Sequence, residues 1–156
     1  MRLHNANDDR WTPHATVAVI VYREEKFLLV EEMSGGRAVF NQPAGHIDED
    51  EAVEAAAIRE TLEETGYTVK LNALLGLYVY QSPTNKVTYH RYCYIAEVVD
   101  YDETLPLDQG IIGPQWMSIE EIRTSERLRS PLVLKCFEDY LLGKYLPLDA
   151  VIEFGS

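Results

Sequence analysis

Residues 42–67 read QPAGHIDEDEAVEAAAIRETLEETGY, and this stretch decides both the fold and the chemistry that the sequence predicts. Its second half is rich in Ala, Glu and Leu, which are good helix formers. Acidic residues gather at its start and Gly66 follows its end, as expected for the two ends of a helix. The pattern therefore predicts a helix over Asp48–Thr65, preceded by a turn that contains Pro43 and Gly45.

Three carboxylates converge on one side of this predicted helix. At about 100° per residue, Glu60, Glu63 and Glu64 fall within an arc of roughly 100°. Like charges at this spacing cost a helix about 0.2–0.5 kcal/mol per pair, and the single cation Arg59 leaves an excess of negative charge. Mg²⁺ prefers oxygen ligands and is usually held by a few carboxylates together with substrate phosphates. The patch therefore indicates a Mg²⁺ site, with a solvated acidic helix face as the alternative for an isolated E-x-x-E-E pattern.

The same helical wheel predicts how the helix packs. Ala55, Ile58 and Leu62 cluster on the side opposite the carboxylates, and the small Ala56 lies between the acids. We therefore expect an inner apolar face and an outer acidic face that opens into a cleft.

The segments around the helix alternate between strands and helices. Tyr and β-branched residues dominate the strand-like runs, Ser118 and Glu121 form an S-x-x-E capping box, and Ser130-Pro131 marks the start of a last helix that ends near Gly143. This order predicts an α/β fold with a mixed sheet flanked by helices. Residues 1–13 read as a flexible arm and residues 14–156 as a single domain. The expected strands are Ala15–Tyr22 and Phe27–Val30, which form a hairpin, then Thr68–Gln81, Thr88–Val99 and Gln115–Met117.

Composition narrows the class of partner. The chain has 156 residues, of which 46% are hydrophobic, and a formal net charge of -12, so its average surface repels nucleic acids and anionic membranes. A small phosphorylated substrate bound through a metal ion is compatible with that charge. Cys93 and Cys136 lie among apolar residues and are expected to pack in the core as reduced thiols. With neither a secretory segment nor an apolar run long enough to span a bilayer, we expect a cytoplasmic protein.

A family resemblance rests on the spacing within the opening stretch. Gly45, five residues, Glu51, seven residues and then RETLEETGY at 59–67 resemble the Nudix box, G-x5-E-x7-R-E-U-x-E-E-x-G-U. Thr61 and Tyr67 depart from the aliphatic preference of that pattern at packing positions. Outside the box, residues 41–46 (NQPAGH) and 129–133 (RSPLV) are similar to the NudJ-type branch of bacterial nucleotide phosphatases.

The resemblance implies an α/β/α sandwich and a set of site residues. In the family, the box binds Mg²⁺, or Mn²⁺ in its place, through carboxylates and often a backbone carbonyl near the box glycine. The arginine pairs with glutamates and orients them, and one glutamate activates the attacking water. Carried onto this chain, the metal-binding residues are Glu60, Glu63, Glu64 and Gly45, and the catalytic set is Glu63, Arg59 and Glu51.

Two parts of the site stay open at this stage. Many relatives use a carboxylate outside the box as the general base. In this chain the candidates are Asp102, Glu103 and Asp108, in the loop over 101–114. The alternative for each is a solvated loop residue without a catalytic role. Arg37 or Arg91 could contact phosphate, and Tyr80 could stack on a base, although tyrosines that alternate along a strand more often pack within a sheet.

The sequence supports one leading function and two alternatives. The leading hypothesis is a metal-dependent hydrolase that cleaves phosphoanhydride bonds of nucleoside tri- or diphosphates or related small pyrophosphates. The alternatives are an ADP-ribose or sugar-nucleotide pyrophosphatase and a non-catalytic domain that senses nucleotides. The sequence leaves the choice between monomer and homodimer open.

Overall fold

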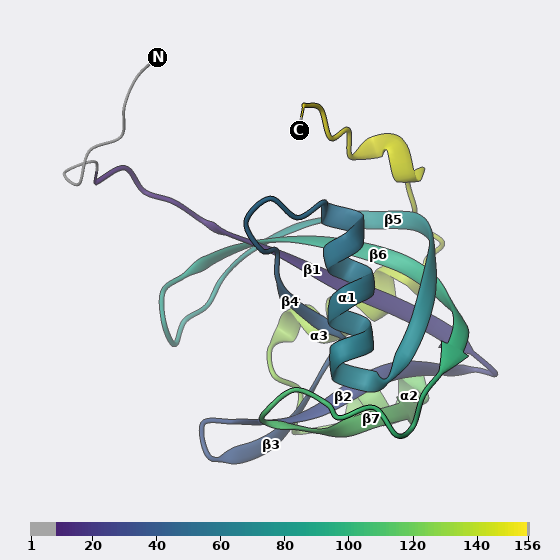
Figure 1. Cartoon of the computed structure of the whole chain (residues 1–156). Helices are drawn as coiled ribbons and strands as arrows, with labels where there is room; N and C mark the ends of the chain where they lie inside the picture. Colours follow the sequence, from purple (N-terminus) through teal and green to yellow (C-terminus); the bar gives the residue numbers. More distant parts are fainter. Residues whose placement is uncertain (1–8, 156) are drawn as a thin grey trace.

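The computed structural model describes residues 9–155, and its secondary structure alternates as expected (Figure 1). The element order is β1 (His14–Arg23), β2 (Lys26–Ser34), β3 (Arg37–Asn41), β4 (Ala44–His46), α1 (Val53–Thr65), β5 (Tyr67–Gln81), β6 (Thr88–Tyr101), β7 (Ile111–Met117), α2 (Ile119–Thr124), α3 (Pro131–Leu141) and the 3-10 turn η1 (Leu148–Ala150).

The strands form a mixed sheet in which β1 and β2 separate beyond their turn. Among the described residues the order is β3-β2-β1-β6-β5, with β4 paired to β1 and β7 paired to β2. β1 and β6 are parallel, whereas the other pairs are antiparallel. β1 and β2 pair only beside their turn, through Tyr22 with Phe27 and Arg23 with Lys26. Beyond that point the two strands separate, and β1 pairs with β4 instead.

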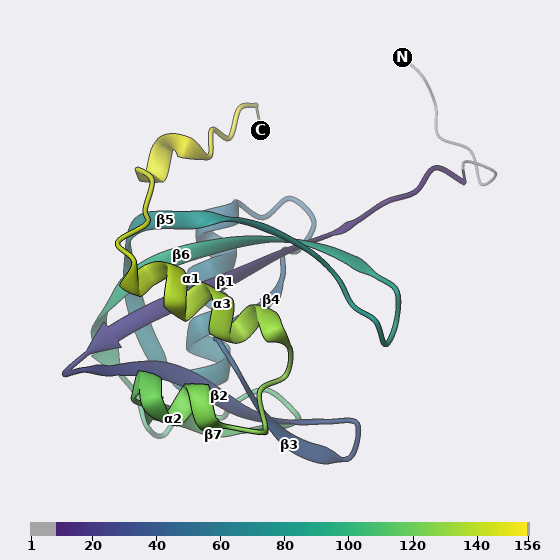
Figure 2. The ribbon, with the colours of Figure 1, turned by 180° about the vertical axis from the view of Figure 1, so that it is seen from behind.

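Alternating side chains of β1 build two cores, one on each face of the sheet. Val17, Val19 and Val21 pack on the α1 side, while Ala18 and Ile20 pack with residues of α3. Figures 1 and 2 show α1 on one face and α2 and α3 on the other. The predicted sandwich of helices around a mixed sheet is confirmed, and Cys93 and Cys136 are buried in the second core as expected.

Helix α1 begins later than the sequence predicts. The expected start was Asp48, but the helix starts at Val53, because Asp50 has a φ of 63° and interrupts the helical path. Glu51 instead closes a turn, in which its side chain accepts a hydrogen bond from the Asp48 backbone N–H at 2.9 Å. The Val53 N–H, left without a side-chain cap from Ala52, donates to Glu153 near the chain's end at 3.0 Å.

The predicted inner face of α1 is wrong for two of its three residues. Ala55 is exposed and Leu62 is only half-buried, whereas Ile58, although half-buried, packs against the core. The buried residues of the helix are Ala56, Ala57, Thr61 and Thr65.

These buried side chains are small, so the helix approaches the sheet closely. At about 100° per residue, Glu60 and Glu64 fall between Ala56 and Thr61 on this same face. Two of the box carboxylates therefore point toward the protein. The prediction of one apolar inner face and one acidic outer face did not include this arrangement.

Three strands also differ from expectation. β4 forms where a turn was predicted, β3 forms where no element was predicted, and β7 begins at Ile111 instead of Gln115. All three are short strands or edge segments that gain their hydrogen bonds from β1 and β2, so their pairing depends on contacts distant in sequence. The division into an arm over 1–13 and a single domain over 14–156 stays a prediction, and residues 1–8 lie outside the described part.

Candidate active site

Gly45 allows a carboxylate to lie directly against strand β4. It pairs with Val17 of β1, and a Cβ atom at this position would meet Oε2 of Glu60 at 2.1 Å. No side chain larger than hydrogen fits there while Glu60 keeps its position. The close contact explains physically why glycine precedes the helix at this spacing.

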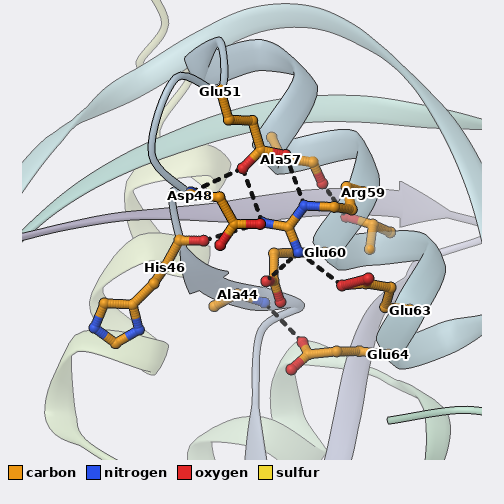
Figure 3. A network of polar contacts seen from close by, with 10 residues as sticks. Ala44, His46, Asp48, Glu51, Ala57, Arg59, Glu60, Glu63 and Glu64 are labelled. Atoms are coloured by element: carbon orange, nitrogen blue, oxygen red, sulfur yellow. Dashed lines mark hydrogen bonds and ion pairs between the residues drawn. The ribbon is translucent and has the colours of Figure 1, made fainter.

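Arg59 joins the carboxylates into one network (Figure 3). Its Nε donates to Glu51 at 2.6 Å, and its Nη1 donates to Glu60 at 2.8 Å and to Glu63 at 2.7 Å. Its Nη2 donates to the His46 carbonyl at 3.1 Å, which connects the helix to β4. The hydrogen bond to Glu51, followed by those to the other two glutamates, raises the pKa of Arg59. The guanidinium thus fixes the orientation of the three carboxylates, as the resemblance implies for the arginine of the box.

Three carboxylates from two parts of the chain meet beside this network. Glu60, Glu63 and Asp108 each offer an oxygen, and these oxygens lie within 4.8 Å of one another. Ligands of an octahedral Mg²⁺ at about 2.0–2.1 Å from the ion lie at most about 4.2 Å apart, so small side-chain movements bring the three oxygens into range. The backbone supports this arrangement, since the Asp108 N–H donates to the Glu63 carbonyl at 3.1 Å.

The other two loop carboxylates lie apart from this cluster. Asp102 is exposed and accepts hydrogen bonds from its neighbour Thr104, at 3.0 Å from the N–H and 2.6 Å from the hydroxyl. Glu103 is exposed as well. Of the three candidates outside the box, the structure brings Asp108 to the box glutamates and leaves Asp102 and Glu103 outside the cluster.

Negative charge and burial both act on the clustered carboxyl groups. Burial raises the pKa of Glu60, and the charges of Glu63 and Asp108 add to the increase, while Arg59 opposes it. Glu64 is deeper and accepts a hydrogen bond from the Ala44 N–H at 2.9 Å. Burial raises the pKa of Glu64 to about 8, against that hydrogen bond and with help from nearby carboxylates. A divalent cation would relieve this accumulation of negative charge.

The raised pKa of Glu64 predicts how the metal-free protein responds to pH. The folded state holds this proton up to about pH 8, whereas the unfolded chain releases it near its ordinary pKa of 4.5. Where the folded state binds more protons, stability falls as pH rises. The free energy of unfolding should therefore fall between these two pH values, by at most about 1.4 kcal/mol per pH unit.

Urea denaturation in EDTA at pH 5.5 and pH 8 measures this loss of stability. The loss of stability between the two pH values should be smaller in Glu64→Gln than in wild type. In the exposed control Glu97→Gln it should equal that of wild type. A loss in Glu64→Gln as large as that of wild type would contradict the raised pKa of Glu64.

A cleft of about 530 Å³ adjoins the acidic cluster. Gly45 and Glu64 lie on its wall, so the cleft and the carboxylates share one boundary. Its other walls come from β1, β2, β3, β5 and β6, the hairpin over 82–85 and the first turn of α3. The arrangement can place a phosphorylated compound in the cleft with one phosphate at the carboxylates.

The substrate candidates from the sequence separate into two groups. Tyr80 and Arg91 line the cleft. Arg37 does not; it lies at the start of β3, where its Nη2 donates to the Glu126 carbonyl at 3.0 Å. Tyr94 is fully buried in the core and Tyr78 donates to Asp139 at 2.8 Å, which fits the packing alternative for those two rings.

Three polar residues around Arg91 were not predicted as site residues from the sequence. Glu32 and Arg129 line the cleft, and the buried Gln42 accepts a hydrogen bond from Arg91 behind it; they come from three separate segments that only the fold brings together. A basic residue directly before the predicted start of a helix at Ser130 was a usable signal for Arg129, because a helix N-terminus favours anions.

A family model named for the NUDIX domain matches residues 12–135. The phosphatase NudJ of Escherichia coli K12 is 39% identical over 143 residues, which cover 92% of this chain and 93% of that protein. The chain belongs to the Nudix hydrolases. The stretch quoted first is thus a Nudix box, and the carboxylate network described above is built around it.

Solved structures agree with this membership. A Nudix hydrolase from Nitrosomonas europaea is 41% identical, with a TM-score of 0.90 over 93% of this chain and 100% of its own. An ADP-ribose pyrophosphatase from Streptococcus suis is 20% identical, with a TM-score of 0.62 over 83% of this chain and 92% of its own. The second likeness shows the fold alone and does not favour the ADP-ribose alternative. Among the described residues, no helix has the length and apolarity needed to cross a membrane.

Proposed function

We propose that this Nudix hydrolase uses Mg²⁺, with Mn²⁺ as an accepted substitute, to hydrolyse phosphoanhydride bonds of nucleoside tri- or diphosphates or related small pyrophosphates. The observation that carries the proposal is the meeting of Glu60, Glu63 and Asp108 oxygens within 4.8 Å, beside a cleft whose wall includes Gly45 and Glu64. The name of the E. coli relative, a phosphatase, supports the same class of reaction.

The proposed roles follow from the contacts. Glu60 and Glu63 would hold the metal ion, with Glu64 and the Gly45 carbonyl as further candidates on the cleft side. When bound, such an ion neutralises phosphate oxygens and lowers the pKa of a water molecule that it holds. Glu63 is the preferred acceptor of the proton from the attacking water. Asp108, which lies in the same cluster, is the alternative base from outside the box.

Arg59 and Glu51 are positioning residues in this proposal. Arg59 spans Glu51, Glu60 and Glu63, so it holds the metal-binding carboxylates in one orientation and limits their mutual repulsion. Glu51 in turn fixes the guanidinium through two hydrogen bonds, at 2.6 Å to Nε and 2.9 Å to Nη2. In hydrolysis the water oxygen bonds to phosphorus, the bridging P–O bond breaks, and the leaving phosphate or nucleotide carries away the electron pair.

A phosphate-release screen tests the proposal. The full chain is incubated with nucleoside tri- and diphosphates, ADP-ribose and small pyrophosphorylated metabolites, in Mg²⁺, in Mn²⁺ and in EDTA. For ADP-ribose, whose products carry only phosphomonoesters, an added phosphatase converts the products to inorganic phosphate. We expect release from at least one tri- or diphosphate in either metal, and no release in EDTA. Turnover that persists in EDTA, or turnover of ADP-ribose alone, would refute the proposal as stated.

The cellular setting remains a set of predictions. We propose a cytoplasmic protein that acts as a monomer or homodimer on a small phosphorylated substrate, without nucleic acid or membrane partners. The net charge of -12 supports the exclusion of polyanionic partners.

A further inference from the structure

Arg91 carries a positive charge on the wall of the cleft, and few protein groups balance this charge. It lies on β6, in register with Thr16 of β1, on the face of the sheet that also carries Cys93 and the α3 core. Its Nη1 donates to the neutral side chain of Gln42 at 3.0 Å. Its Nε is shielded from solvent and has no hydrogen-bond partner among the described residues. A buried donor of this kind is normally paired, and leaving it unpaired is costly.

The electrostatics around Arg91 favour an anion. Burial lowers the pKa of Arg91, and the positive charge of Arg129 contributes in the same direction. A guanidinium nevertheless stays protonated in proteins, so the side chain keeps its charge. The negative charge of Glu32 acts on Arg91, but Glu32 already binds Arg129 at 2.7 Å and the Asn41 amide at 3.4 Å. The positive charge of Arg91 is therefore only partly compensated by protein groups.

The N-terminus of α3 faces the same space. Ser130, Pro131 and Leu132 line the cleft beside Arg129. Ser130 is the N-cap of this eleven-residue helix, yet its hydroxyl makes no capping hydrogen bond. The positive end of a helix dipole and a free hydroxyl donor both favour a negatively charged ligand. They lie on the same cleft that Arg91 lines.

We propose that Arg91, Arg129 and the N-terminus of α3 form a second anion subsite, which holds a phosphate group of the substrate other than the one at the metal-binding carboxylates. The inference rests on the proposed function and narrows it. It selects compounds that carry at least two phosphate groups, one at the metal-binding carboxylates and one at the subsite. The tyrosines Tyr80 and Tyr89 line the cleft as well and are available to contact the organic part of such a compound.

The direct test measures binding of inorganic phosphate to the metal-free protein. Isothermal titration in EDTA compares wild type with Arg91→Gln and Arg129→Gln. Each change should weaken phosphate binding at least about tenfold, the size expected when a charge-assisted hydrogen bond is lost. Arg91→Lys keeps the charge without the planar fork and should lie between wild type and Arg91→Gln. Equal affinity for wild type and both Gln variants would overturn the subsite.

A neighbouring arginine provides a matched control. Arg127 pairs with Glu31 as Arg129 pairs with Glu32, and the two arginine side chains are similarly exposed, at 43% and 48%. Arg127 lies outside the cleft, however, and stacks on Phe40. Arg127→Gln should leave phosphate affinity within about twofold of wild type. A loss as large as that of Arg129→Gln would show that general surface charge, and not the subsite, binds phosphate.

Steady-state kinetics separate this inference from the proposed function. With a substrate found in the screen, Arg129→Gln should raise KM at least about tenfold and change kcat less, because the subsite binds a group that does not react. If the screen fails while phosphate binding depends on Arg91 and Arg129, the subsite stands and the proposed reaction falls. If hydrolysis occurs and the variants behave as wild type, the reaction stands and the subsite is refuted. Should Arg91→Gln fail to fold, Arg129→Gln and Arg91→Lys decide the question.

Discussion

Replacement of Glu63 by Gln is expected to lower kcat by about two orders of magnitude or more. The substitution keeps the size of the side chain but removes a negative charge from the cluster with Glu60 and Asp108. It also removes the preferred acceptor for the proton of the attacking water. The measurement is phosphate release by purified wild type and variant at saturating substrate and Mg²⁺, so that a change in kcat is not confused with weaker binding.

A second glutamate on the same helix controls for changes in charge and helix stability. Glu54 lies in the first turn of α1, away from the clustered oxygens, and Glu54→Gln should keep kcat within about twofold of wild type. Folding of Glu63→Gln should be preserved, because Arg59 keeps its contacts with Glu51 and Glu60. Wild-type turnover in Glu63→Gln would move the role of base to Asp108, which Asp108→Asn would then test.

Local signals explain which parts of the fold could be predicted. Helix α1 ends at Thr65 as expected, because Gly66 adopts a left-handed conformation with a φ of 80° and its N–H returns to the Leu62 carbonyl. The capping box at Ser118 also forms as predicted. The start of α1 was misplaced because acidic residues favour both the first turn of a helix and a loop. The positive φ of Asp50, which delays the helix, is not specified by the local sequence.

The site was predictable only where its residues are close in sequence. The contacts of Arg59 with Glu51 and Glu63 agree with the pairing that the resemblance to the Nudix box implies, and all three residues lie on one helix and its preceding turn. Asp108 could be named only as one of three loop candidates, since its selection depends on a backbone hydrogen bond to Glu63. Arg91 illustrates the same limit, because a single arginine on a strand does not reveal that the fold buries its Nε.

Gly45 connects the predictable and unpredictable parts of the site, and its substitution has the second largest expected effect. In Gly45→Ala, the new Cβ would overlap Oε2 of Glu60 at 2.1 Å. The obstacle is the end of a flexible side chain, so Glu60 can swing aside and the protein should fold, with a stability change below about 1 kcal/mol. The displaced carboxylate leaves the cluster, and the Mg²⁺ concentration for half-maximal activity should rise at least about tenfold.

Two comparisons identify the cause of that effect. Gly76→Ala is the matched control, since a Cβ there meets its nearest atom, in Tyr78, at an ordinary 3.4 Å, and its Mg²⁺ dependence should equal that of wild type. If Gly45 acts through Glu60, the double variant Gly45→Ala/Glu60→Gln should require little more Mg²⁺ than Glu60→Gln alone, because both changes remove the same ligand. Additive effects would instead mean that Gly45 contributes independently, for example through its carbonyl. A Gly45→Ala protein with wild-type Mg²⁺ dependence would show that the position of Glu60 against β4 does not matter for metal binding.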